Sequence, residues 1–122
     1  MFNALVLVGL GGAAGSIARF LISYFMAKRF TSGFPWATFS VNIFGALLIG
    51  IFIGLFAKPP EQTQLKLLLI TGFCGGFTTF STFSLENISL LQQGQYGMAA
   101  LYVLASLVFG VLAVWLGLQF AR

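Results

Sequence analysis

The sequence predicts an all-α integral membrane protein with four membrane-spanning helices, and three observations support this fold class. Hydrophobic residues make up 59% of the 122 residues and charged residues only 7%, whereas soluble domains carry about 25% charged residues. The mean hydropathy is +1.01. Apolar residues also gather in segments that reach the roughly 20 residues a membrane-spanning helix needs. These segments are 2–27, 36–57, 67–91 and 98–121, and together they form a single domain over 1–122.

The composition also narrows the classes of function. The chain has no histidine, one cysteine and two acidic residues, so we expect neither a transition-metal site nor a hydrolytic triad, and no enzyme activity. Cys74 cannot form an internal disulfide and is interpreted as a small apolar filler. We assign the net charge of +4 to the flanks of the membrane spans rather than to nucleic-acid binding.

The first segment, 2–27, is too long for the apolar core of a signal peptide, which has about 7–15 residues, so we predict a permanent helix. Gly11 and Gly15 form a GxxxG pair, which is typical of a helix face that another helix approaches closely.

Arg19 is the one charged residue in this first segment. It lies eight residues before Ala27, or roughly 12 Å of helix, and helical side chains lean toward the N-terminus. Its side chain is therefore predicted to point into the membrane, where an arginine normally faces a partner or a cavity. A structural ion pair and a place in an aqueous vestibule for anions both fit this position.

The second segment, 36–57, follows a short loop that ends at Pro35, and Trp36 is a predicted interfacial anchor. Ala46, Gly50 and Gly54 repeat the small-residue spacing of helix packing. Asn42 is the strongly polar residue of this span. It can bridge two helices, or its NH2 group can donate to an anion.

The third segment, 67–91, is predicted to break near 72–78, because residues 72–84 contain three glycines, five hydroxyl side chains and four phenylalanines. Glycine costs about 1 kcal/mol in a helix interior and threonine is a weak helix former. A broken helix at membrane depth frees backbone groups that lipid cannot satisfy. The segment after the break would present a new helix N-terminus, which favours anions.

The fourth segment, 98–121, carries Tyr102, Ser106 and Gly110 four residues apart, so they share one helix face. The two hydroxyls can join helices or line a polar track.

The charges on the two sides of the membrane are nearly balanced. Four spans place both termini and the 58–66 loop on one side, with Lys58, Lys66 and Arg122, while Lys28 and Arg29 lie on the other. Orientation normally follows an excess of basic residues, so we expect this chain to insert both ways. Two copies would then form an antiparallel homodimer, in effect an inverted-repeat transporter.

The residues around the predicted break suggest two kinds of ligand. Phe80 and Phe83 are three residues apart and lie on one side of the second half-helix. Their ring edges would suit an anion and their faces a cation, although such a pair is also typical of core packing. Main-chain carbonyls near Gly75 and Thr78 could hold a hard cation such as Na⁺, with two from each copy on the two-fold axis.

At these residues the sequence resembles the small dual-topology fluoride channels of the Fluc or CrcB family. Three motifs carry the resemblance, which covers essentially the whole chain. They are Gly11, Gly12, Gly15 and Arg19; then Val41, Asn42 and Gly45; and the long run from Gly75 to Ser84, which is the most specific. Glu86 and the pair Tyr102 and Ser106 fit the pattern too.

The resemblance implies an antiparallel homodimer in the bacterial inner membrane, passively exporting cytoplasmic fluoride through two pores and so reducing fluoride toxicity. Fluoride would pass the ring edges of Phe80 and Phe83, and a central structural Na⁺ would be bound by main-chain oxygens of Gly75 and Thr78 from both chains. The resemblance places Arg19 at a vestibule and implies that further residues line or support the pore: Asn42, Ser81, Thr82, Tyr102 and Ser106.

One position departs from the family pattern: Gly110 stands where some members carry another hydroxyl. The alternative function is a small dual-topology, proton-coupled exporter of drugs or other cations. Such exporters use a membrane carboxylate, typically in the first helix, whereas the intramembrane acid here is Glu86, late in the third segment. A non-transporting subunit is a third reading, but it leaves the clustered polar residues unexplained.

Overall fold

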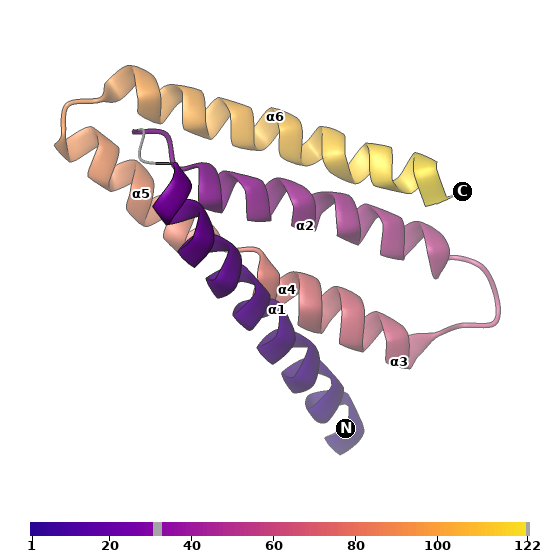
Figure 1. Cartoon of the computed structure of the whole chain (residues 1–122). Coiled ribbons are helices and arrows are strands. Elements are labelled where there is room, and N and C mark those ends of the chain that lie inside the picture. The colour runs from indigo at the N-terminus through magenta and orange to yellow at the C-terminus, as the bar shows by residue number, and fades with distance from the viewer. Residues whose placement is uncertain (31–32, 122) are drawn as a thin grey trace.

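The computed structural model describes residues 1–30 and 33–121, and this part of the chain is all-helical and contains no strand (Figure 1). Part of the 28–35 loop and Arg122 lie outside the described residues. The elements are α1 (Phe2–Arg29), α2 (Trp36–Leu55), α3 (Thr63–Leu65), the π-helix η1 (Lys66–Cys74), α4 (Gly75–Phe77), α5 (Phe80–Gln92) and α6 (Tyr96–Ala121).

Four helical segments of the described chain are long and apolar enough to cross a membrane. They are Phe2–Arg29, Trp36–Leu55, Thr63–Gln92 and Tyr96–Ala121, with mean hydropathies of 1.9, 2.1, 1.3 and 2.4. The third runs from α3 through α5. Both described chain ends and the link from α2 to α3 lie at one end of the molecule, and the other two links lie at the opposite end (Figure 1). This is the arrangement that an even number of spans produces.

Helix α2 packs along α6 through small residues. A Cβ placed on Gly50 would collide with the Val114 carbonyl oxygen, and one placed on Gly54 would lie 2.7 Å from Cβ of Ala121. Glycine therefore lets these two helices approach to backbone contact, as the small-residue spacing predicts.

Helix α1 approaches η1 and α4 in the same way. A Cβ on Gly11 would collide with the carbonyl oxygen of Leu68, and a Cβ on Gly15 with that of Phe73. Both glycines are buried. The GxxxG pair thus forms the contact face for the third helical segment, one turn before Arg19.

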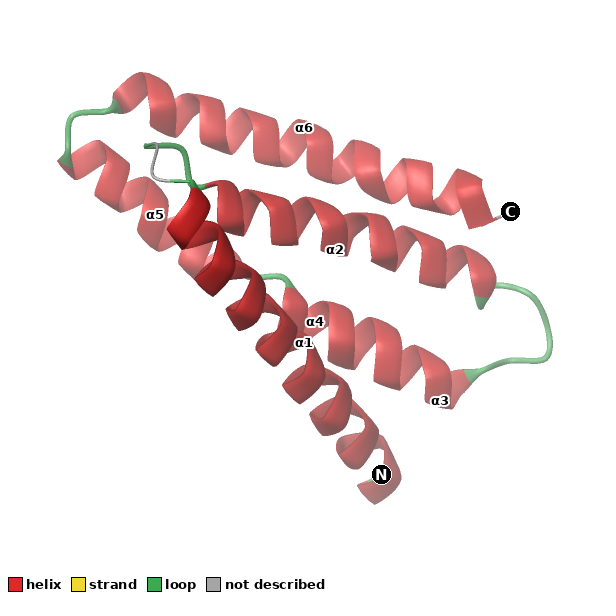
Figure 2. Ribbon diagram, viewed as in Figure 1, coloured by secondary structure: helices red, strands yellow, loops and turns green. Residues whose placement is uncertain are grey.

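The predicted break in the third segment is displaced in the structure. Residues 72–77, which the sequence assigns to the break, remain helical, and the non-helical residues are Thr78 and Thr79. Figure 2 shows this short link, between α4 and α5, as a loop within the body of the molecule. Two of the three glycines pack against α1: a Cβ on Gly72 would lie 3.0 Å from Cα of Gly11, and a Cβ on Gly76 would lie 3.0 Å from Cα of Gly12. Tertiary contact here overrides the low helix propensity of glycine.

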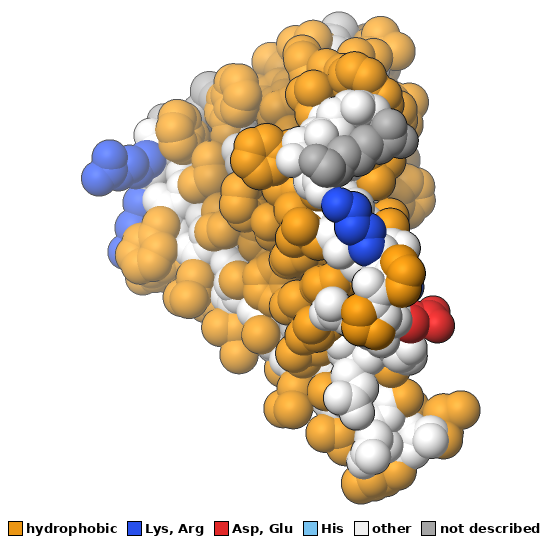
Figure 3. Space-filling view, turned by 90° about the vertical axis from the view of Figure 1, so that its right-hand side faces the viewer, with side chains coloured by type: hydrophobic (Ala, Val, Ile, Leu, Met, Phe, Trp, Pro, Cys, Tyr) orange, Lys and Arg blue, Asp and Glu red, His pale blue; other side chains and the backbone are white. Residues whose placement is uncertain are grey.

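Most of the face shown in Figure 3 is hydrophobic. The fully buried side chains of appreciable size are those of Tyr102, Phe77 and Val41, and only 11–22% of each hydrophobic span is buried within one chain. Such a surface requires lipid or another copy of the chain as its surroundings.

Candidate functional site

The break, Thr78 and Thr79, separates two half-helices. Thr78 has φ −89° and ψ 157°, and Thr79 has φ −148° and ψ 123°, so both backbones are extended. Thr79 is the N-cap of α5, because its Oγ1 accepts a hydrogen bond from the Thr82 N–H at 3.2 Å. A threonine side chain at this position satisfies one of the free N–H groups at the start of a helix.

Asn42 of α2 holds the break from the side. Its Oδ1 accepts from the Thr79 N–H at 2.8 Å, and its Nδ2 donates to the Thr79 carbonyl oxygen at 3.1 Å. The amide side chain therefore replaces the helical partners that Thr79 has lost, which explains how the interruption is tolerated away from water. Of the two roles left open from the sequence, bridging is present, and one Nδ2 hydrogen remains for a second acceptor.

These two contacts leave the predicted cation ligands free. In a continuous helix the Thr79 N–H would bond to the Gly75 carbonyl and the Thr82 N–H to the Thr78 carbonyl, but both N–H groups bond to side chains instead. Within residues 1–30 and 33–121, no backbone N–H of a turn, loop or helix cap donates to either carbonyl oxygen. The described residues contain no cluster of His, Cys, Asp or Glu that could hold a metal. Main-chain oxygens of this kind suit a hard cation such as Na⁺.

A cavity of about 260 Å³ opens beside the break, and we call it the break cavity. Ser106 is one of its lining residues, and the Ser106 hydroxyl is buried with no hydrogen-bond partner. The Phe80 and Phe83 ring centroids lie 5.9 Å apart, with the rings tilted by 37°. Phe80 is 79% exposed. The cavity thus combines polar donors with aromatic rings. Its lining residues are Asn42, Thr78, Thr79, Phe80, Phe83, Ser106 and Leu107.

Three of the predicted pore residues lie outside the lining of the break cavity. Ser81 is exposed, and Thr82 accepts a hydrogen bond from the Thr79 hydroxyl at 3.3 Å. Tyr102 is fully buried and packs against Phe83, with ring centroids 4.8 Å apart and the rings tilted by 59°. In a single chain these three side chains do not form the cavity wall.

Tyr102 belongs to a cluster that sequence reasoning missed. Its hydroxyl donates to Oε1 of Glu86 at 2.8 Å, and the Thr38 hydroxyl donates to Oε2 at 3.0 Å. An acid inside a membrane span needs hydrogen-bond donors, so the position of Glu86 could have indicated such partners. Their identity depends on how α2, α5 and α6 meet, which residue spacing does not give.

Arg19 of α1 reaches the other side of the break. Its Nε donates to the Gly76 carbonyl oxygen at 3.1 Å, and the residue is half-buried. The salt bridge found among the described residues joins Lys66 and Glu61, 3.8 Å apart. Within the described chain, the structural ion pair considered for Arg19 is therefore replaced by a contact to the main chain.

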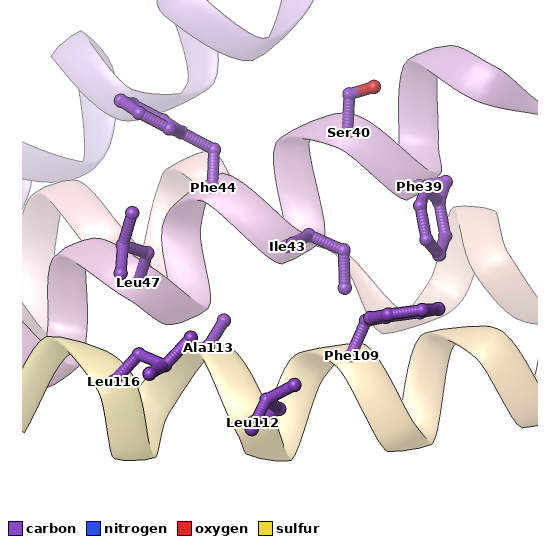
Figure 4. Close-up of a pocket in the computed structure, with 9 residues that line it drawn as sticks. All are labelled: Phe39, Ser40, Ile43, Phe44, Leu47, Phe109, Leu112, Ala113 and Leu116. Atoms are coloured by element: carbon purple, nitrogen blue, oxygen red, sulfur yellow. The ribbon is translucent and has the colours of Figure 1, made fainter.

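A second hollow lies between α2 and α6 and is almost entirely apolar (Figure 4). Its volume is about 450 Å³, and the Ser40 hydroxyl points away from the other labelled side chains. It includes none of the predicted site residues and offers no donors for an ion. It is lined by Phe39, Ser40, Ile43, Phe44, Leu47, Phe109, Leu112, Ala113 and Leu116.

Comparison with known proteins shows which family the chain belongs to. The family model described as CrcB-like protein, Camphor Resistance (CrcB), matches residues 6–118. The chain is also similar to three proteins that are each named a fluoride-specific ion channel. The protein from Phocaeicola vulgatus is 44% identical over 95% of this chain and 96% of its own length. The protein from Flavobacterium psychrophilum is 47% identical over 94% of both chains, and the one from Prosthecochloris aestuarii is 46% identical over 99% of this chain and 94% of its own. With a family model covering nearly its whole length and relatives this similar, the chain belongs to the CrcB family of membrane proteins.

Proposed function

We propose that this chain is a fluoride-selective ion channel that passively exports fluoride from the bacterial cytoplasm and so reduces fluoride toxicity. Its membership of the CrcB family and the names of its relatives support this function, as do its four apolar helices. The relatives are named as channels rather than as enzymes or cation exporters, so the proton-coupled exporter finds no support among them.

The observation that carries the proposal is the unpartnered hydroxyl in the break cavity. Ser106 lines the break cavity together with Asn42, Phe80 and Phe83, and its Oγ is buried without a hydrogen-bond partner. A buried hydroxyl that makes no bond costs about 1–3 kcal/mol, so its presence favours a ligand that accepts a hydrogen bond from it. Fluoride is a small anion that accepts hydrogen bonds and carries no donor.

The chemistry of the lining fits passage rather than tight binding. Ser106 and the remaining Nδ2 hydrogen of Asn42 can donate to fluoride, and the edges of aromatic rings carry a partial positive charge. None of the seven lining residues is charged. A conducting site must bind its ion strongly enough to admit it but weakly enough to release it, which neutral donors and ring edges provide.

We propose further that two copies assemble as an antiparallel homodimer with two pores. The balanced basic residues of the two membrane sides support dual insertion. Phe80 is 79% exposed, and a Cβ on Gly75 would meet nothing within 4 Å. The break is therefore open on the side away from α1, where a second copy would complete each pore and where lipid would otherwise meet polar backbone.

In that dimer, the carbonyl oxygens of Gly75 and Thr78 from both chains would hold a structural Na⁺. Their freedom from the hydrogen bonds of a continuous helix supports this assignment. When bound, Na⁺ would neutralise the partial negative charge where the first half-helix ends.

The proposal is tested by replacing Ser106 with alanine in protein reconstituted into liposomes. S106A removes one donor to the ion, which is worth about 1.5–3 kcal/mol for a charged acceptor, so we expect fluoride efflux to fall by about tenfold or more. Thermal stability should not fall, since the hydroxyl makes no bond in the protein.

The matched control is S89A, which removes an exposed serine of α5 outside the break cavity. S89A should conduct as the wild type does. Unchanged fluoride efflux in S106A would show that Ser106 does not contact the ion. The main support for the break cavity as the pore would then be lost.

A further inference from the structure

Arg19 continues the stripe of small residues on α1. Gly11, Gly15 and Arg19 are spaced four residues apart, so they lie on one face of the helix. The two glycines bring α1 to backbone contact with η1 and α4. The first large side chain on this face after the contact is that of Arg19, at the level of the break.

The contact that Arg19 makes is with the main chain of the first half-helix. Its Nε donates to the carbonyl oxygen of Gly76 at 3.1 Å, and Gly76 lies in the last turn before Thr78. A Cβ on Gly76 would collide with the Gly12 carbonyl oxygen, so this turn cannot move closer to α1. Carbonyls at a helix C-terminus carry partial negative charge and lack helical partners, and an arginine donor is a suitable cap for them.

Several polar groups around the break have a hydrogen-bond partner. Arg19 occupies the Gly76 carbonyl, and Asn42 occupies both the N–H and the carbonyl of Thr79. The Thr78 hydroxyl bonds to the Cys74 carbonyl at 2.9 Å. The carbonyls of Gly75 and Thr78 lack such contacts, and Gly75 is open on the side where its Cβ would point.

We infer that Arg19 is a positioning residue for the cation site: by holding the Gly76 carbonyl on the α1 side, it keeps the Gly75 and Thr78 carbonyls directed to the other side. This inference rests on the proposed function, since it concerns the proposed Na⁺ site of the channel. It differs from a vestibule role, in which only the positive charge of Arg19 acts on passing anions.

Two substitutions separate the hydrogen bond from the charge. In glutamine the side-chain nitrogen is attached to Cδ, as Nε is in arginine, so R19Q keeps a donor at the same place in the chain of atoms and loses the charge. The methionine of R19M is similar in length to glutamine and has neither a hydrogen-bond donor nor a charge. A positioning role predicts that the two variants differ, whereas a role for charge alone predicts that they behave alike.

The experiment measures two responses to Na⁺ in the purified, full-length protein. The first is the melting temperature in detergent over a series of Na⁺ concentrations, with the large cation N-methylglucamine keeping ionic strength constant. The second is fluoride efflux from liposomes over the same series. We expect R19Q to keep the wild-type Na⁺ midpoint in both responses, and R19M to need about tenfold more Na⁺ because a hydrogen bond that orders the ligands is lost.

Equal Na⁺ midpoints in R19Q and R19M would overturn the inference, as would a wild-type protein that conducts fluoride with no response to Na⁺. If R19M does not fold while R19Q folds with the wild-type midpoint, the donor is shown to matter and the inference stands. If neither variant folds, charge is what the fold requires and the inference fails. Absence of fluoride efflux in the wild type would refute the proposed function, and the Na⁺-dependent melting would still decide the role of Arg19.

Discussion

At the scale of single residues, the site depends on side chains that replace backbone partners. Asn42 bonds to both backbone groups of Thr79, and the Thr79 hydroxyl accepts from the Thr82 N–H. Side chains therefore satisfy the interrupted backbone at a depth where lipid cannot. Because the N–H groups of Thr79 and Thr82 bond to side chains, the Gly75 and Thr78 carbonyls remain available for a cation.

Phe80 and Phe83 provide a test of the proposed ring edges. Replacing either with isoleucine keeps an apolar side chain and removes the aromatic quadrupole, which contributes about 0.5–1.5 kcal/mol in specific contacts. We expect fluoride efflux to fall by about two- to tenfold, with the proposed dimer still formed. The measurement is fluoride-electrode efflux from liposomes together with the apparent mass on size-exclusion chromatography.

The control for this pair is F20I, which changes a phenylalanine that is 64% exposed on α1, outside the break cavity. It should leave efflux unchanged. Wild-type efflux in both F80I and F83I would mean that the rings serve packing alone.

The sequence was informative about which residues gather at the break, and less so about what each one does. Asn42, Phe80, Phe83 and Ser106 all line one cavity, and their residue types suggested polar or aromatic contact with an ion. The hydrogen bond from Tyr102 to Glu86 could not be predicted, because it depends on the relative rotation of α5 and α6. The contact between Arg19 and Gly76 could not be predicted either. Its acceptor is a main-chain carbonyl, which every residue carries, so the sequence does not indicate which one is used.

At the scale of the helical elements, glycine positions determine how α1 meets the third segment. Hydrophobic segment length predicts the four spans well, because a membrane requires about 20 apolar residues in succession. Local propensity misplaced the interruption, since Gly72 and Gly76 pack against α1 and stay helical. Contacts with another helix keep these glycines helical, and helix propensity does not account for such contacts.

Gly15 and Gly9 give a matched test of this helix contact. A methyl group at Gly15 would collide with the Phe73 carbonyl oxygen, whereas a Cβ at Gly9 meets nothing within 4 Å. We expect G15A to lower the free energy of unfolding by about 1–3 kcal/mol through overpacking. G9A should be neutral or stabilising, because alanine is the better helix former by about 1 kcal/mol.

The measurement is thermal unfolding of both purified variants in the same detergent, followed by circular dichroism. If G15A melts at the temperature of G9A, then α1 does not pack against the third segment through this face.

At the scale of the whole molecule, the surface of one chain is largely apolar. Many large hydrophobic side chains are exposed, as on the face shown in Figure 3. At the break, a Cβ on Gly75 would meet nothing within 4 Å. A second copy inserted the other way up would cover the open carbonyls and give two equivalent pathways, which agrees with the near balance of basic residues on the two sides. Lipid would cover the remaining apolar faces.

Ion selectivity follows from the same arrangement. The lining of the break cavity offers neutral donors and ring edges but no fixed charge. Fluoride is smaller than chloride and accepts stronger hydrogen bonds, so hydrogen-bond donors such as the amide of Asn42 favour fluoride over larger anions. We therefore expect strong discrimination between fluoride and chloride.

The most direct test uses purified wild-type protein in liposomes loaded with both potassium fluoride and potassium chloride, in the presence of Na⁺. A potassium ionophore balances charge, and electrodes follow the two anions outside. We expect rapid fluoride efflux while chloride stays inside, and no fluoride efflux from protein-free liposomes. Equal efflux of the two anions, or proton-dependent uptake of organic cations without fluoride efflux, would contradict the proposal of a fluoride-selective channel.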